Sequence, residues 1–172
     1  MNRRCFMVKS IDNIPGMFFE KVTMGAFSNR EELRQAIVAS GKRINFDAGK
    51  ILDSVTISPA KKEVYLWSVS GKALGFTDAT SQPAIYERVF SYGLSEAPAE
   101  AIVLARIDFA GEEWQNGGMK PAEIGQSGRK GILSLSSVSG SLWLSVTPIN
   151  PNYCWDPSFN WLFEISHDLL LF

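Results

Sequence analysis

Residues 131–146, GILSLSSVSGSLWLSV, decide the fold that we expect for this chain. Apolar and polar residues alternate on both sides of Ser139-Gly140, with leucines at positions 133, 135, 142 and 144. Side chains of a strand point to alternate faces of the sheet, so a period of two predicts a strand with one apolar face and one polar face. Since Ser-Gly favours a tight turn, the stretch predicts an antiparallel hairpin that is buried on its leucine face alone.

Further strands are expected where β-branched and aromatic residues are dense. These segments are residues 5–10, 18–24, 51–58, 63–69 and 101–109. Because strands follow one another without a regular alternation of strand and helix, the pattern favours a mainly antiparallel sheet.

Two helices are indicated by their end signals. Ser28 and Glu31 have capping-box spacing, and Gly41 suits the residue after a helix end, which predicts a helix at 29–40. Proline in the first turn and apolar pairs four residues apart predict a second helix at 83–92. We therefore expect a single α+β domain over residues 1–172, with a mainly antiparallel sheet and two to three helices.

The C-terminal stretch is compatible with two structures. Asp156-Pro157 is typical of a helix start, and apolar residues after it fall on one helical face. Alternation of apolar and polar residues from Phe163 to Asp168 equally fits a strand. We prefer the helix for residues 157–171.

Composition restricts the classes of function. With 172 residues, of which 45% are hydrophobic and 20% charged, the chain can bury a normal core. Seventeen basic and eighteen acidic residues leave a net charge of −1, which argues against nucleic-acid binding. Cys5 and Cys154 lack metal-ligand spacing and favour free thiols in a cytoplasmic protein. No apolar stretch is long enough to span a membrane, so we expect no membrane association.

Catalytic motifs are sparse. The chain has no P-loop, no GxGxxG loop after a strand and no GxSxG nucleophile elbow, so we expect no cofactor. Asp108 lies at the end of the strand expected at 101–109, and Glu112 and Glu113 begin the glycine-rich segment after it; the three are candidate Mg²⁺ ligands for a hydrolase or a phosphoryl-transfer enzyme. His167 is the one imidazole available as a base, but its neighbour Asp168 is badly placed to orient it. A solvated turn and a surface histidine are the simpler interpretations, so we expect neither catalysis nor a metal site.

A long loop is expected at residues 111–131, which contain six glycines and one proline. Long loops in compact domains are often functional. Trp114 and Met119 are candidate contact residues because a glycine-rich loop has little reason to carry large apolar side chains unless something receives them. Arg129-Lys130, the last basic pair of the chain, is a candidate binding pair within the same loop.

Large rings are concentrated in the last third of the chain. They are Trp143, Tyr153, Trp155, Phe159, Trp161, Phe163 and Phe172. Buried, they form part of a core, which we favour; exposed, they act as interface anchors, for which Trp155 and Trp161 are the candidates.

The sequence therefore predicts a non-catalytic protein that binds another protein through the glycine-rich loop and the aromatic C-terminal third. Small inhibitor, immunity and anti-defence proteins have this profile. Homo-oligomerisation would use the same features. The alternatives are an enzyme with dispersed carboxylates or His167 and, third, a nucleic-acid-binding protein whose basic pairs gather on one face.

Overall fold

The leucine–serine stretch forms the expected hairpin. Strands β7 (Lys130–Val138) and β8 (Ser141–Ile149) pair antiparallel, and Ser139 and Gly140 form the turn with positive φ angles of 50° and 79°. Such backbone angles suit the twist of a two-residue hairpin turn. The expectation of a half-buried hairpin is wrong. Ser134, Ser136 and Ser145 are buried, as are the leucines on the other face of the hairpin at positions 133, 135 and 144.

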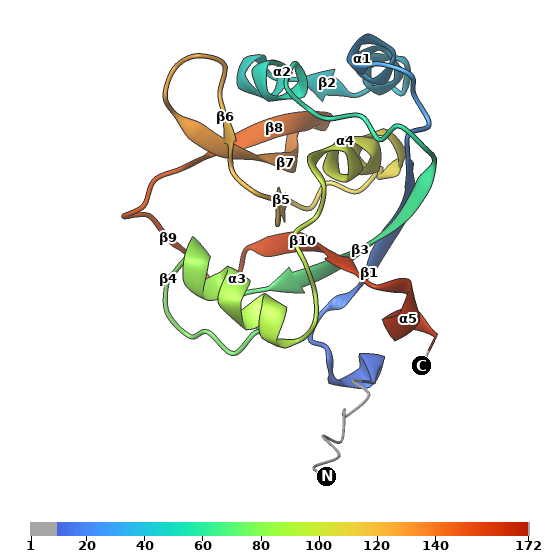
Figure 1. Cartoon of the computed structure of the whole chain (residues 1–172). Helices are drawn as coiled ribbons and strands as arrows, with labels where there is room; N and C mark the ends of the chain where they lie inside the picture. Colours follow the sequence, from blue (N-terminus) through green and yellow to red (C-terminus); the bar gives the residue numbers. More distant parts are fainter. Residues whose placement is uncertain (1–9, 172) are drawn as a thin grey trace.

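A computed structural model, which describes residues 10–171, shows a single α+β domain built on one curled, mostly antiparallel sheet (Figure 1). The strand order is β1-β3-β10-β5-β7-β8-β2, and β6 pairs with β7. Within residues 10–171, only β10 with β5 and β2 with β8 pair parallel. The remaining strands of this sheet are β1 (Met17–Met24), β2 (Arg43–Ile44), β3 (Lys62–Ser70), β5 (Gln115–Gly117), β6 (Ala122–Glu123) and β10 (Asn160–Ile165).

Among residues 10–171 there are five α-helices, which is more than the two to three that we expected. They are α1 (Arg30–Ala39), α2 (Phe46–Leu52), α3 (Gln82–Ser91), α4 (Ala99–Asp108) and α5 (His167–Leu170). The two helices expected at 29–40 and 83–92 are confirmed as α1 and α3. The cap of α1 lies one residue later than predicted, since Asn29 accepts a hydrogen bond from the Glu32 amide.

Helix α4 lies within the curve of the sheet and contacts β1, β7 and β8 (Figure 1). Helix α3 lies on the other side of the sheet from α4. It places Tyr86 edge-on against Trp161 and Phe163 of β10, with ring centroids 5.9 and 5.1 Å apart. Helices α1 and α2 lie over the end of the sheet that carries β2. Both faces of the central strands are therefore covered.

Three expectations are corrected. Residues 101–109 belong to helix α4, not to a strand, and residues 51–58 complete α2 and continue as an irregular segment. Residues 157–171 form strand β10 and the short helix α5 in place of one helix. The strand expected at 5–10 lies almost wholly outside the described residues. Within residues 10–171, no helix has the length and apolar character that a bilayer crossing requires.

Candidate functional site

Four predicted contact residues divide into core and surface positions. Met119, Trp155 and Trp161 are 2%, 3% and 0% exposed, whereas Trp114 is 43% exposed. Trp161 and Met119 are therefore core residues. Trp161 fits the core interpretation that we favour for the C-terminal rings, whereas Met119, predicted as a contact residue, is not open at the surface. The Met119 carbonyl accepts a hydrogen bond from the Tyr86 hydroxyl at 2.7 Å, so this part of the glycine-rich segment is fixed to α3.

The segment 111–131 is not a structureless loop. Strand β5 pairs parallel with β10 and antiparallel with β7, and β6 extends the edge of β7. Gly118 allows this close packing, because a Cβ there would lie 2.5 Å from the ring of Phe163. The result is that Trp114 directly precedes an ordered strand and has a fixed position at the surface.

A cleft of about 240 Å³ lies beside Trp114, and we call it the aromatic cleft. Its lining residues come from β5, β8 and the segment around strand β9 (Cys154–Trp155), which pairs with β4 (Thr80–Ser81). They are Trp114, Asn116, Thr147, Tyr153, Trp155 and Phe159. None of them carries a charge, so the cleft suits an apolar or aromatic group.

Buried Asn116 orients Trp114. The indole Nε1–H of Trp114 donates to Oδ1 of Asn116 at 3.0 Å, and the Thr147 hydroxyl donates to the same oxygen at 3.2 Å. The Asn116 amide nitrogen donates in turn to the Asn160 carbonyl at 3.3 Å. Because this network uses the polar end of the indole, the exposed part of Trp114 is its apolar surface.

Trp155 connects the aromatic cleft to the core. Its ring lies 4.7 Å from Trp161 on the core side, and 5.0 and 6.2 Å from Tyr153 and Phe159 on the cleft side. All three pairs are edge-to-face, the arrangement that aromatic rings prefer. Tyr153 is 48% exposed, so Trp114 and Tyr153 supply the accessible apolar surface.

The catalytic candidates do not assemble into a site. Asp108 ends α4, and Glu112 and Glu113 are exposed in the segment that follows. His167 stacks on Tyr65 with ring centroids 5.0 Å apart, at the start of α5. Among residues 10–171, no three acidic, histidine or cysteine side chains gather closely enough to hold a metal ion.

Asp108 instead affects the pKa of a carboxyl group in the neighbouring strand β1. Burial and the negative charge of Asp108 raise the pKa of Glu20 in β1. A raised carboxyl pKa is a feature of general acids, but it equally results from two carboxylates placed near one another at a helix end. Neither Glu20 nor Asp108 lines the aromatic cleft, and neither lines the second cleft described below.

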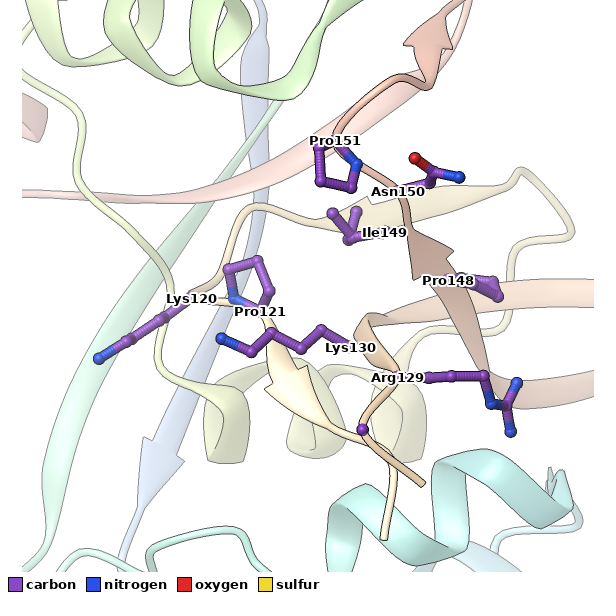
Figure 2. A pocket seen from close by; sticks show the side chains of 9 residues that line it. Lys120, Pro121, Arg129, Lys130, Pro148, Ile149, Asn150 and Pro151 are labelled. Atoms are coloured by element: carbon purple, nitrogen blue, oxygen red, sulfur yellow. The ribbon is translucent and has the colours of Figure 1, made fainter. Parts of the chain in front are cut away.

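A second cleft contains the predicted pair Arg129 and Lys130, and we call it the basic cleft. It measures about 670 Å³ and lies where β7 begins and β8 ends (Figure 2). Its lining residues are Lys120, Pro121, Gly128, Arg129, Lys130, Pro148, Ile149, Asn150 and Pro151. The sequence pattern identified the basic pair but missed Lys120, because only the pairing of β6 with β7 brings this lysine near them.

Asn116, Tyr153 and Phe159 were also missed as site residues. The one available signal was that Asn116 follows Trp114 by two residues, which places both side chains on the same face of an extended chain.

Comparison with known proteins gives no match, whether to a protein-family model, to a curated protein or to a solved structure.

Proposed function

We propose that this protein is a non-catalytic binding protein that holds another protein through the aromatic cleft, as small inhibitor and immunity proteins do. The observation that carries the proposal is the state of Trp114, whose ring is 43% exposed although its indole nitrogen is fixed by Asn116. An immobilised aromatic surface loses little entropy when a partner covers it.

The chemistry of the aromatic cleft defines what it can receive. Its volume of about 240 Å³ is below the ~300–1,000 Å³ typical of small-molecule sites. It is uncharged and has the exposed rings of Trp114 and Tyr153 at its rim. These properties favour one large apolar or aromatic side chain of a partner protein, which the rings of Trp114 and Tyr153 would cover. Tryptophan and tyrosine are the residue types that most often dominate interface energy.

The test compares partner binding by the wild type, Trp114→Ala and Phe46→Ala. Phe46 is 80% exposed and lies outside the aromatic cleft, so its substitution controls for the loss of any exposed ring. Proteins captured from the source cell are identified by mass spectrometry, and the affinity of the purified partner is then measured by calorimetry. We expect Trp114→Ala to weaken binding by about 30-fold, the effect of an interface hot spot of ~2 kcal/mol, and Phe46→Ala to leave it unchanged.

Equal binding by the wild type and Trp114→Ala would refute the aromatic cleft as the contact surface. Light scattering over a range of protein concentrations tests whether the partner is a second copy of the chain. A dimer that Trp114→Ala converts to monomer would identify homo-oligomerisation as the function of the aromatic cleft.

A further inference from the structure

We infer that the basic cleft binds an organic phosphate whose remaining part is apolar or aromatic, with a nucleoside diphosphate as the representative ligand. This inference is independent of the proposed function, because Trp114 and the rest of the aromatic cleft take no part in it. The argument depends on the charges at the rim, the nature of the walls and the size of the cleft.

Two of the three positive charges at the rim, those of Lys120 and Lys130, are not held in an ion pair by the described residues. Among residues 10–171, no acidic residue lines the basic cleft. Figure 2 shows both lysine side chains extending in the same direction, with Lys130 ending beside Pro121 and Lys120 extending beyond it. Two such ammonium groups attract a dianion, because each acts as a compact point charge with three donors.

Arg129 has a different role. Its guanidinium extends away from the two lysines in Figure 2 and lies 3.6 Å from a carboxylate oxygen of Asp47 in α2. Asp47 is also 3.8 Å from Lys50, so its charge is shared. Arg129 therefore limits the basic cleft on the side of α2, and the phosphate is expected at Lys120 and Lys130.

The walls are apolar and rigid. Pro121, Pro148 and Pro151 have no backbone N–H to offer, and Ile149 adds an aliphatic surface beside them. A hydrophilic ligand such as a sugar phosphate would find few donors on these walls. A planar or apolar group can instead pack against the prolines while its phosphate reaches the lysines.

Size favours a small molecule over a macromolecule. The volume of about 670 Å³ is nearly three times that of the aromatic cleft and falls within the ~300–1,000 Å³ of typical ligand pockets. An acidic peptide would need an extended charged surface, whereas the charges here are confined to the two lysines and Arg129. The net charge of −1 likewise gives no general attraction for polyanions.

Calorimetric titration of the full chain tests the inference with four probes: ADP, adenosine, inorganic pyrophosphate and a hexaglutamate peptide. We expect ADP to bind saturably and more tightly than each of the others, since it alone combines the phosphates with an aromatic body. Lys120→Gln and Lys130→Gln should each weaken ADP binding by about tenfold, the effect of losing one charge-assisted contact. The matched control is Lys61→Gln, which removes an exposed lysine outside both clefts and should change the affinity less than twofold.

Several results would overturn the inference. They are the absence of saturable ADP binding, equal binding of ADP and pyrophosphate, tighter binding of hexaglutamate, and an effect of Lys61→Gln as large as that of Lys130→Gln. Thermal unfolding of each variant confirms that the fold is intact, which is expected because Lys120 and Lys130 are exposed. Trp114→Ala must leave ADP binding unchanged. The ADP titration and the partner-binding test of the aromatic cleft can therefore succeed or fail independently of each other.

Discussion

Glu100 is a buried carboxylate whose replacement gives a quantitative test of the fold. It lies in the first turn of α4, is 2% exposed, and its two oxygens accept hydrogen bonds from the backbone amides of Gly25 and Ser58, each at 2.8 Å. Pro98, the N-cap residue, provides no side-chain cap. Glu100 therefore joins the end of β1 and the segment before β3 to the start of α4, where a negative charge is favourable.

The expected cost of Glu100→Gln follows from these two bonds. The new side chain keeps one acceptor oxygen but places an NH₂ group against the second backbone N–H. One charge-assisted bond is then weakened, the other is lost and a buried donor is left unsatisfied, for a cost of about 2–3 kcal/mol. Glu100→Ala loses both bonds and leaves the amides of Gly25 and Ser58 unsatisfied, for a cost of roughly 3–5 kcal/mol.

Urea unfolding at neutral pH measures these losses. With a slope near 2 kcal/mol/M, Glu100→Gln should lower the unfolding midpoint by about 1 M urea. Hydrogen exchange of the Gly25 and Ser58 amides should accelerate in both variants, which a general loss of helix stability would not single out. Glu112→Gln, an exposed substitution of the same type, is the control. A change below about 0.5 kcal/mol in Glu100→Gln, the scatter of surface substitutions, would refute this reasoning.

Two further predictions concern charges in or near α4. Arg106 is 0% exposed, and its Nε and Nη1 atoms have no hydrogen-bond partner among residues 10–171, while Nη2 donates to the Phe109 carbonyl. Arg106→Met should therefore raise the free energy of unfolding by about 1–2 kcal/mol in urea titrations, because it removes a buried unpaired cation, and a loss of stability would contradict this. The raised pKa of Glu20 favours its protonated form in the folded state. The stability that this protonation contributes is present below the usual pKa of glutamate and is lost as the pH rises through the pKa of Glu20 in the folded state. Glu20→Gln should unfold like the wild type at about pH 4 and be more stable at about pH 7, and an equal difference at both values would contradict a pKa raised by burial and by the charge of Asp108.

Sequence patterns predicted the elements that alternate in composition or carry clear end signals, and failed for helix α4 and strand β10, whose buried residues show neither. The hairpin of β7 and β8 and helices α1 and α3 have clear periods or end signals, and all were found. Helix α4 is enclosed by the sheet, so every residue from Glu100 to Arg106 is buried and the 3.6-residue period disappears. Its β-branched residues then resembled a strand, and Pro98 before it was the signal that could have corrected the prediction.

Strand β10 illustrates the same effect in a sheet. It lies between β3 and β5, so both of its faces are buried, and Trp161, Leu162 and Phe163 form an unbroken apolar run. Alternation begins only at Phe163, so Asp156-Pro157 and the apolar residues on one helical face decided the prediction in favour of a helix. In the structure, Asp156 accepts a hydrogen bond from the Ser158 amide at 2.8 Å and forms a turn before the strand. Local end signals of this kind identify a turn but not the element that follows it.

The candidate sites were only partly predictable because each is formed by segments far apart in the sequence. Residues 114–116, 147 and 153–159 meet in the aromatic cleft, and residues 120–121, 128–130 and 148–151 meet in the basic cleft. Composition identified Trp114, Arg129 and Lys130, whose residue types are unusual for their segments. Asn116 and Lys120 are ordinary in type, and only strand pairing gives them a position beside those residues.

The aromatic residues near the C-terminus divide according to their place in the sheet. Trp161 and Phe163 belong to a central strand and pack against Tyr86 of α3, so they are core residues. Tyr153 lies before the short strand β9 at the surface, where it is half exposed. Trp155 contacts both groups, with one side against the core and the other lining the aromatic cleft. A ring fixed in this way gives the cleft a rigid floor, and a rigid surface loses less conformational entropy than a mobile one when another group covers it.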